Sequence, residues 1–299
     1  MLFQRGSLWE RITSTTSQAI SSGALIPIST DYTFIEQGGI RFFVRVLSSL
    51  SLKDAAREEQ TQMKEAGKII NPFLPPEKEL TVAEISDTHI AILNKYNVME
   101  HHLLIVTRHF EDQGMLLTLP DFEALWSCMS EYDAFGFYNG GREAGASQQH
   151  KHLQIVPLPL APEGPSIPIA PLLARAPAEG TGAVPGFAFL HDFARLARNL
   201  SKSPLDAART TFKLYNEMLR HVGLTSTREP GLARQAAPYC LLIARDWMLL
   251  VPRSKEFFDG ISFNSLAFAG SLFVRNVEQL NCLKTFGPMN ALNRVAVNR

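Results

Sequence analysis

The chain has 299 residues, of which 45% are hydrophobic and 19% charged. This composition fits a globular protein of one large or two moderate domains and argues against intrinsic disorder. Lys plus Arg and Asp plus Glu number 29 each, so no overall charge attracts nucleic acid or an anionic membrane, and neither is expected as a partner.

The first predicted elements are a helix and a strand. Residues Leu8–Ser21 have a weakly amphipathic helical spacing, and residues Gly39–Leu47 are rich in the β-branched and aromatic side chains typical of a strand. Residues 71–78 contain three prolines. Because proline lacks an N–H group and restricts the residue before it, we expect a loop there.

Two strands, a helix and a third strand follow. The strands are predicted at Thr88–Leu93 and His102–Val106, the helix at Asp121–Tyr132, and the third strand at residues 150–155. Short links between these elements favour an antiparallel sheet with helices on one side.

A proline-rich segment marks the predicted domain boundary. Eight prolines occur between Pro157 and Gly186, so we interpret this segment as a linker that crosses the surface without packing. The predicted division is residues 1–160, a linker at 161–188, and residues 189–299.

The C-terminal part is predicted to contain a helix at Pro204–Val222 and a hairpin formed by Tyr239–Ala244 and Met248–Val251. Residues His102–Arg108 and Tyr239–Arg245 also share a pattern. The sequence leaves open whether the C-terminal half has a related sheet plan, as an internal duplication would give.

Cysteines and apolar segments bear on location. Cys128, Cys240 and Cys282 are widely spaced and odd in number, which argues against a disulfide framework and a Cys-x-x-Cys metal site. No apolar run reaches the roughly 18 residues of a membrane span, and the first residues lack a signal-peptide core. We therefore expect a cytoplasmic protein.

The most informative stretch is residues 139–154, where a loop of small residues leads into a His-x-His-x-Gln segment. Such a loop lets backbone N–H groups approach a phosphate, and a strand directs His150, His152 and Gln154 to one side. If a backbone carbonyl holds the Nδ1–H of His152, the Nε2 atom is an unprotonated nucleophile for phosphorus.

Other interpretations of this segment stay open. A single histidine in a strand is most often a hydrogen-bonded core residue, and His-x-His on a strand can place two imidazoles on one metal ion. A metal needs a third ligand, for which Gln154 is poorly suited. The Gln154 amide can instead bind a phosphoryl oxygen without acting as acid or base, so the site should favour an anionic acceptor over water.

These residues resemble the histidine triad superfamily in its transferase branch, and specifically the diadenosine tetraphosphate phosphorylases, also called ATP adenylyltransferases. The similarity extends to Gly23–Leu25, Arg45–Lys53, Asn71–Phe73, Asn94–Tyr96, Arg108–Gln113, Leu249–Ser254 and Asn264–Gly270. It implies an α+β fold with a histidine-triad-like antiparallel β-sheet flanked by helices. Residues 1–160 would be the catalytic domain and 189–299 an ATP adenylyltransferase domain.

The resemblance also implies the reaction and the residues that perform it. His152 would attack the α-phosphorus of diadenosine tetraphosphate, release ATP and carry AMP, which inorganic phosphate then removes as ADP; the reaction is reversible. Gln154 would steady the phosphoryl oxygens. The implied substrate contacts are Lys53, Asn94, Lys95, Asn139, Gly145, Ala146, Ser147, Gln148, Asn264, Ser265, Leu266, Ala267, Ser271 and Arg275.

Mg²⁺ or another divalent cation is expected mainly on the substrate phosphates, because no acidic cluster with Mg²⁺-ligand spacing stands out. His101 and His102 are interpreted as structural, and Phe110, Trp126 and Trp247 as core residues.

Three other functions remain: a histidine triad dinucleoside polyphosphate hydrolase, a sugar-1-phosphate nucleotidylyltransferase, and a nucleotide-binding sensor without turnover. Gln154 argues against the hydrolase. Lys151 stands where the sugar enzymes usually have proline, and an intact nucleophile argues against the sensor.

Overall fold

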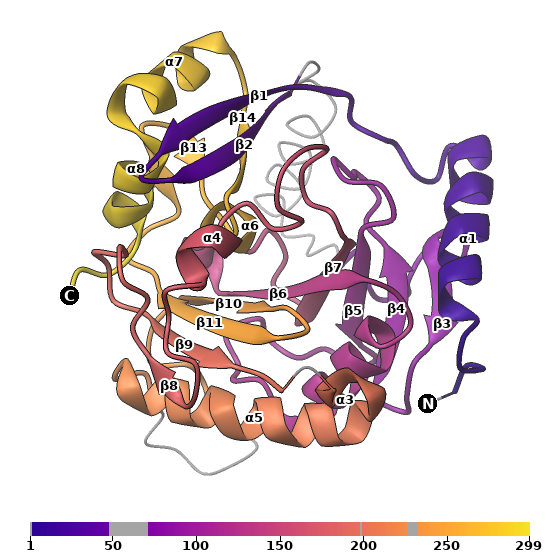
Figure 1. The fold of residues 1–299 in the computed structure, drawn as a ribbon. Helices are drawn as coiled ribbons and strands as arrows, with labels where there is room; N and C mark the ends of the chain where they lie inside the picture. The colour runs from indigo at the N-terminus through magenta and orange to yellow at the C-terminus, as the bar shows by residue number, and fades with distance from the viewer. Residues whose placement is uncertain (1, 48–70, 198, 226–232) are drawn as a thin grey trace.

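A nine-stranded antiparallel sheet forms the centre of the computed structural model, which describes residues 2–47, 71–197, 199–225 and 233–299 (Figure 1). Its strand order is β3-β4-β5-β7-β6-β10-β11-β9-β8. The strands are β3 Thr81–Glu84, β4 His89–Leu93, β5 Leu103–Thr107, β6 Ala134–Gly140, β7 His152–Pro157, β8 Thr181–Gly182, β9 Asp192–Arg195, β10 Tyr239–Ile243 and β11 Trp247–Pro252.

Both halves of the chain build this sheet. Strands β6 and β10 pair antiparallel, with Tyr239 opposite Gly140 and Ile243 opposite Gly136. The two segments that share a pattern correspond to β5 and β10 of this sheet, and an internal duplication stays open. The division into two domains stays a prediction, but the two sides of the proposed boundary share hydrogen bonds along β6 and β10.

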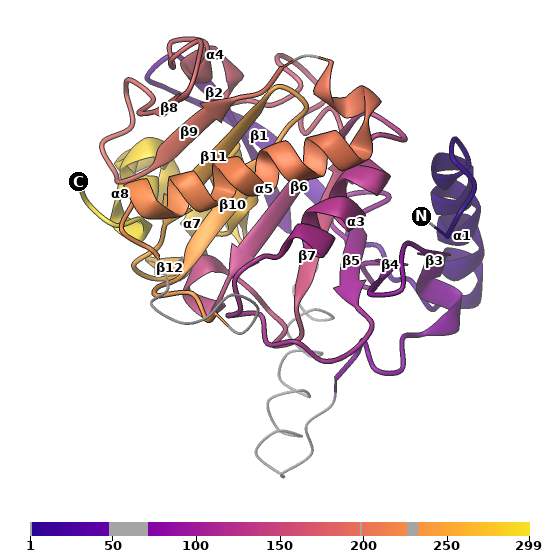
Figure 2. The ribbon, with the colours of Figure 1, turned by 90° about the horizontal axis from the view of Figure 1, so that it is seen from below.

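Two long helices cover one face of the sheet (Figure 2). They are α3 Leu119–Met129 and α5 Pro204–His221, and they pack on each other through buried side chains, with Trp126 Nε1 donating to Thr211 Oγ1 at 2.9 Å. Helix α1 Leu8–Ser22 lies beside the edge strand β3 (Figure 1). The α+β fold class is confirmed, and the predicted elements are present with ends shifted by a few residues.

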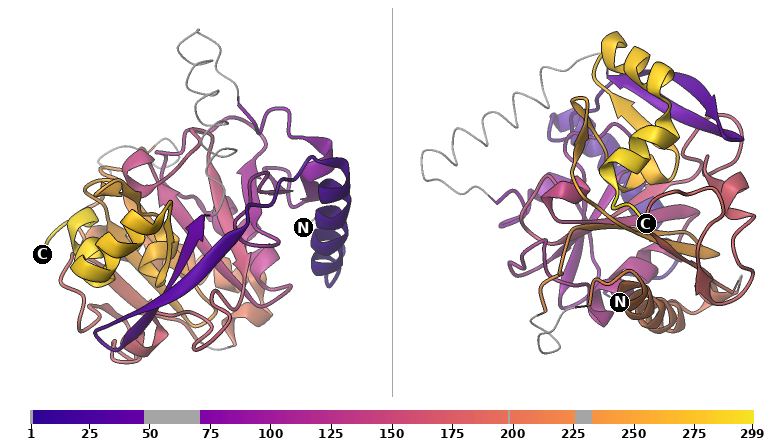
Figure 3. Two further views of the ribbon diagram at one scale, coloured as in Figure 1. Left: turned by 90° about the horizontal axis from the view of Figure 1, so that it is seen from above. Right: turned by 90° about the vertical axis from the view of Figure 1, so that its left-hand side faces the viewer.

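A second layer covers the opposite face (Figure 3). It contains a three-stranded sheet in which β2 pairs antiparallel with β1 and parallel with β14, so the first and last parts of the chain lie side by side. The elements of this layer are β1 Thr30–Gln37, β2 Ile40–Leu47, α4 Ala170–Leu173, β12 Phe257–Phe258, β13 Ile261–Ser262, α6 Ser265–Phe268, β14 Ser271–Val274, α7 Val277–Phe286 and α8 Pro288–Val295.

The proline-rich segment is packed, so the expectation that residues 161–188 cross the surface without packing was wrong. Ile169, Leu173 and Val184 are buried in the apolar cluster of the second layer, and the Ile169 N–H donates to the Ala269 carbonyl at 3.1 Å. Prolines fix the bends of this segment, but removal of its isoleucine and leucine side chains from water stabilises the folded chain. Within the described ranges, no helix is long and apolar enough to cross a membrane.

Candidate active site

The His-x-His-x-Gln segment enters the sheet through β7, between β5 and β6. His152 is opposite Val106 of β5, and Gln154 lies between Leu104 of β5 and Phe137 of β6. Leu153 belongs to the apolar cluster under the two long helices. The predicted alternation is therefore confirmed: His152 and Gln154 share the face opposite those helices.

His152, the predicted nucleophile, is a buried and neutral imidazole. Its side chain is 3% exposed, and its Nδ1 atom lies 2.8 Å from the carbonyl oxygen of His150. Because a carbonyl only accepts, Nδ1 carries the proton and Nε2 keeps its lone pair. Burial lowers the pKa of His152 to about 4, so the imidazole is uncharged near neutral pH.

His150 has a supporting position. Its Nε2 atom lies 2.9 Å from the Thr107 carbonyl, and its Nδ1 atom lies 2.9 Å from the Asn71 side-chain nitrogen. These contacts place the proton on Nε2 and engage Nδ1 as an acceptor. His150 therefore holds the carbonyl that orients His152.

Two phenylalanine rings adjoin the histidines. The Phe73 ring lies 5.7 Å from the His150 ring and 5.4 Å from the His152 ring. The Phe110 ring lies 5.5 Å from His150 and is 56% exposed, so the interpretation of Phe110 as a core residue was wrong. It follows a strand end, where its ring extends over His150 instead of inward.

Gln113 is a site residue that the sequence analysis did not single out. Its side-chain oxygen accepts from the His152 backbone N–H at 2.8 Å, and its side-chain nitrogen donates to the Asn139 carbonyl at 2.9 Å. It thus joins the end of β6 to the start of β7, where the intervening loop interrupts the ladder. Its inclusion in the Arg108–Gln113 similarity was the only signal.

Hydrogen bonds between its own backbone groups stabilise the loop between β6 and β7. Gly145 has φ +91°, its N–H donates to the Arg142 carbonyl at 2.8 Å, and the Ala146 N–H donates to the Gly141 carbonyl at 3.2 Å. In this conformation those two amides shape the loop, and the expectation that Gly145 and Ala146 contact phosphate stays a prediction. Binding of phosphate by Ser147 and Gln148 stays a prediction.

Asn139 links this loop to the C-terminal half. Its side-chain oxygen accepts from the Ser265 backbone N–H at 2.9 Å and from the Ser265 hydroxyl at 2.7 Å. A Cβ atom added at Gly145 would lie 2.8 Å from Asn264 Cβ. The structure therefore brings Asn139, the loop and the start of α6 together, with Leu266 and Ala267 buried behind them.

Asn94 reaches the site through a histidine. Its side-chain nitrogen lies 3.2 Å from His102 Nδ1, and His102 Nε2 lies 3.0 Å from the side-chain oxygen of Gln154. Lys95 instead forms an ion pair with Glu77, with N–O distances of 2.8 and 2.9 Å.

The remaining predicted contacts lie elsewhere. Ser271 is in β14, where its hydroxyl accepts from Arg45 Nη1 at 3.0 Å, and Arg275 follows that strand. Ser271 therefore belongs to the three-stranded sheet and Arg275 lies just after it, whereas His152 is in the nine-stranded sheet. Lys53 lies outside the described residues.

A buried ionic network anchors the start of β7 to helix α3. Lys151 is fully buried, with Nζ 2.7 Å from Asp121 Oδ2 and 3.0 Å from Glu111 Oε2, and Asp121 Oδ1 lies 3.0 Å from His89 Nε2. Burial alone would raise the pKa of Asp121, but the His89 hydrogen bond and the Lys151 charge outweigh it and lower that pKa to about 2. The Lys151–Asp121 pair thus ties the residue before His152 to α3.

Arg253 supports the loop from behind. Its guanidinium is buried, and its hydrogen-bond acceptors are four backbone carbonyls and a thiol: Ala144 O, Val295 O, Lys255 O, Phe263 O and Cys240 Sγ. The resulting bonds use all five of its donors. Among the described residues no carboxylate lies within 4 Å of it, so its positive charge is only partly offset by carbonyl dipoles.

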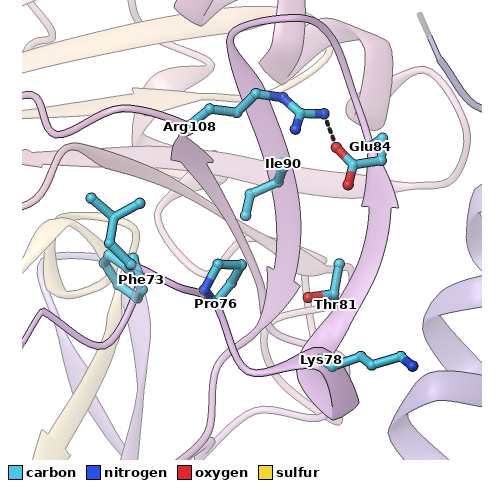
Figure 4. Close-up of a pocket in the computed structure, with 8 residues that line it drawn as sticks. Phe73, Pro76, Lys78, Thr81, Glu84, Ile90 and Arg108 are labelled. Atoms are coloured by element: carbon cyan, nitrogen blue, oxygen red, sulfur yellow. Dashed lines mark ion pairs between the residues drawn. The ribbon is translucent and has the colours of Figure 1, made fainter.

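A pocket of about 320 Å³ adjoins Phe73 (Figure 4). Its apolar lining includes Phe73, Leu74 and Ile90, and an ion pair between Arg108 and Glu84 lies at its rim. This volume is at the lower end for small-molecule sites. Because Phe73 also contacts His152, the pocket is adjacent to the nucleophile.

Comparisons with known proteins give consistent matches. A family profile described as the Ap4A phosphorylase N-terminal domain matches residues 1–175, and one described as the ATP adenylyltransferase C-terminal domain matches residues 185–298. Diadenosine 5',5'''-P1,P4-tetraphosphate phosphorylase 2 of Saccharomyces cerevisiae is 27% identical over 268 residues, which are 81% of this chain and 79% of that protein. Protein APA1 of the same yeast is 27% identical over 233 residues, 70% of each chain.

Solved structures share the fold. The crystal structure of yeast Ap4A phosphorylase Apa2 in complex with Ap4A has a TM-score of 0.78 and 21% identity, and the match covers 100% of this chain and 99% of that one. The same protein in complex with AMP gives a TM-score of 0.77 at 21% identity, with the same coverage.

Proposed function

The chain belongs to the Ap4A phosphorylase family, and from this premise we propose that it cleaves diadenosine tetraphosphate (Ap4A) with inorganic phosphate to ATP and ADP, reversibly. The observation that carries the proposal is His152: a buried, neutral imidazole whose Nδ1 proton is held by a carbonyl. No hydrogen bond to its Nε2 atom occurs within the described part of the chain. That lone pair faces the side of the sheet shared with Gln154.

The first step forms an adduct. His152 Nε2 attacks the α-phosphorus of Ap4A, a P–N bond forms, and the bridging P–O bond to the β-phosphate breaks, so that ATP departs with the electron pair. The imidazole needs no general base, because Nε2 is already unprotonated. The His150 carbonyl accepts the Nδ1–H and stabilises the positive charge that develops on the ring.

The second step releases AMP from His152 as ADP. An oxygen of inorganic phosphate attacks the α-phosphorus, the P–N bond breaks, and ADP leaves while Nε2 regains its lone pair. Gln154 would donate hydrogen bonds to the phosphoryl oxygens without activating water. Arg253, whose charge lies behind the loop, would make the local potential more positive for the phosphates.

The remaining parts of the proposal concern the cation, the location and the loop. We place Mg²⁺ or another divalent cation on the substrate phosphates, where it would neutralise charge. The reason is that the face around His152 and Gln154 offers imidazole and amide groups, whereas a hard cation prefers carboxylate and carbonyl oxygens. A cytoplasmic location is supported by the three free cysteines. Ser147 and Gln148 are proposed to contact phosphate.

The experiment uses Ap4A labelled at the α-phosphorus. Wild-type protein should form an acid-labile, base-stable adduct, and His152→Ala should form none. His191→Gln is the matched control, because His191 Nδ1 also lies 2.8 Å from a carbonyl oxygen, that of Phe189, while its Nε2 accepts from the Val184 N–H at 2.8 Å. An adduct of normal yield in His152→Ala would refute the mechanism.

Product analysis separates the alternatives. Phosphate should accelerate conversion of Ap4A to ATP plus ADP. ATP plus AMP as the main products in the presence of phosphate would indicate a hydrolase. Binding without adduct or products would indicate a sensor, and transfer of AMP mainly to a sugar phosphate would indicate a sugar-1-phosphate nucleotidylyltransferase.

A further inference from the structure

Side chains from the end of β4, the start of β5 and the interior of β7 form a continuous hydrogen-bonded chain that leads to Gln154. Asn94 follows β4, His102 precedes β5 and Gln154 lies in β7. The Asn94 side-chain nitrogen is 3.2 Å from His102 Nδ1, and His102 Nε2 is 3.0 Å from the Gln154 side-chain oxygen. His102 is 8% exposed and Gln154 9%, so water does not replace these contacts freely.

The contacts define the polarity of the chain. An amide nitrogen only donates, so His102 Nδ1 must accept from Asn94 and carry no proton. The neutral ring then holds its proton on Nε2, which donates to the Gln154 oxygen. Both contacts agree on one tautomer, and that tautomer fixes which end of the Gln154 amide is engaged.

We infer that His102 is a positioning residue that orients the Gln154 amide for phosphoryl transfer, and that Asn94 acts by setting the tautomer of His102. This inference rests on the proposed function of the site. With its oxygen held by His102, Gln154 leaves its NH2 group for the phosphoryl oxygens. A reversed amide would present an oxygen lone pair to an anionic phosphate, which repels it.

The inference changes the interpretation of two residues. Asn94 was expected to contact the substrate, which stays a prediction, and its side-chain nitrogen is directed to His102 in the structure. His102 was expected to be structural, and its neighbour His101 fits that description better: it has φ +56°, and its Nδ1 atom lies 3.1 Å from the Thr16 hydroxyl. The adjacent residues His101 and His102 therefore have different roles.

The first test is kinetic. His102→Phe keeps a ring of similar size but removes the donor, and should lower kcat for phosphorolysis about tenfold, the value of one hydrogen bond, with a smaller change in KM. His102→Gln, whose side-chain nitrogen can occupy the place of Nε2, should recover most of the loss. His101→Asn, which suits a positive φ, is the matched control and should keep wild-type activity.

A double-mutant cycle separates positioning from packing. If His102 acts through Gln154, His102→Phe should have no further effect on kcat in a Gln154→Leu background. Additive losses would show that His102 serves only the packing of the sheet and would overturn the inference. Asn94→Ala should likewise have no further effect once His102 is replaced.

The second test does not depend on activity. Nuclear magnetic resonance of protein with ¹⁵N-labelled histidine should show His102 with its proton on Nε2, and Asn94→Ala should reduce that preference. A His102 proton on Nδ1 in the wild type would overturn the inference even if Ap4A phosphorolysis is confirmed. If the adduct is not formed, the proposed function fails, and the tautomer still decides whether the hydrogen-bonded chain exists.

Discussion

The neutral state of His152 makes a quantitative prediction about acid. Burial lowers its pKa to about 4, against an ordinary value of 6.5. At pH 5.5 about 97% of the rings would be unprotonated, whereas an exposed histidine would be about 9% unprotonated. The second-order rate of adduct formation, which reports the free enzyme, should therefore stay nearly flat from pH 8 to 5 and fall by half near pH 4.

The assay is rapid quenching of protein mixed with subsaturating α-labelled Ap4A. Each phosphate of this substrate carries one strongly acidic proton, but its adenine rings also take up a proton in mild acid. The decisive range is therefore from pH 7 to 5, where a histidine of pKa about 4 keeps its rate. Circular dichroism at each pH checks that the protein stays folded, and His191→Gln should give the same profile. A midpoint near pH 6.5 would refute burial as the determinant of this nucleophile.

The same pKa predicts how stability depends on pH. The folded-state pKa of His152 lies below the unfolded value, so the unfolded chain takes up a proton first as pH falls. The stability contribution is complete above pH 6.5 and is lost as pH falls through about 4. The difference of about 2.5 units corresponds to about 3 kcal/mol. Urea unfolding of His152→Leu should show a weaker loss between pH 6.5 and 4 than wild type; an unchanged slope would contradict the assignment.

Three substitutions test the surroundings of the nucleophile. Lys151→Met should lower the free energy of urea unfolding by about 3–5 kcal/mol, because it leaves a buried carboxylate without its ion-pair partner. In the control, Lys95→Met, the side chains of the pair are 37% and 39% exposed, so the loss should be about 0–1 kcal/mol. Equal losses would contradict this prediction. Gly145→Ala should slow adduct formation, because the added Cβ atom would lie 3.0 Å from a carbonyl oxygen. Gly164→Ala is the control, because Gly164 also has a positive φ but no atom within 4 Å of the added Cβ, and it should not slow adduct formation. Phe73→Ala should admit water and move the pKa of His152 toward 6.5, as its nuclear magnetic resonance titration would show; an unchanged pKa would exclude Phe73 as the shield.

Local patterns were enough to predict the elements of the fold and the side-chain alternation around the proposed nucleophile. The two-residue period of His152 and Gln154, with Leu153 between them, required only that one face be apolar and the other polar, and the structure has that arrangement. Helix α5 was likewise predicted from the helical spacing of its apolar residues. These features depend on neighbours a few residues away, which the sequence displays directly.

The supporting residues could not be predicted in this way. Gln113, His102 and Arg253 act through contacts with segments that are 39, 52 and 109 residues away in the chain. Such contacts depend on how strands pair and on which rotamer a long side chain adopts, and neither leaves a periodic signal. The proline-rich segment failed for a related reason, because proline content indicates where the backbone bends and not which side chains are buried.

The contrast between His152 and His191 indicates what distinguishes the proposed nucleophile from a structural histidine. Both rings hold an Nδ1 proton against a carbonyl two residues earlier, at 2.8 Å, and burial lowers the pKa of each to about 4. The Nε2 atom of His191 accepts a backbone N–H, and its lone pair is therefore engaged. Tautomer and pKa are thus shared by a structural histidine and the proposed catalytic one. The distinguishing property is the Nε2 lone pair of His152, which no group within residues 2–47, 71–197, 199–225 and 233–299 engages, on a face that also presents Gln154. Giving His191 a free Nε2, for example by deleting the loop that contains Val184, should therefore not create a second adduct site, because the rings of Phe187 and Phe189 adjoin it where Gln154 adjoins His152. A labelled adduct on His191 in such a variant would show that the lone pair alone is sufficient.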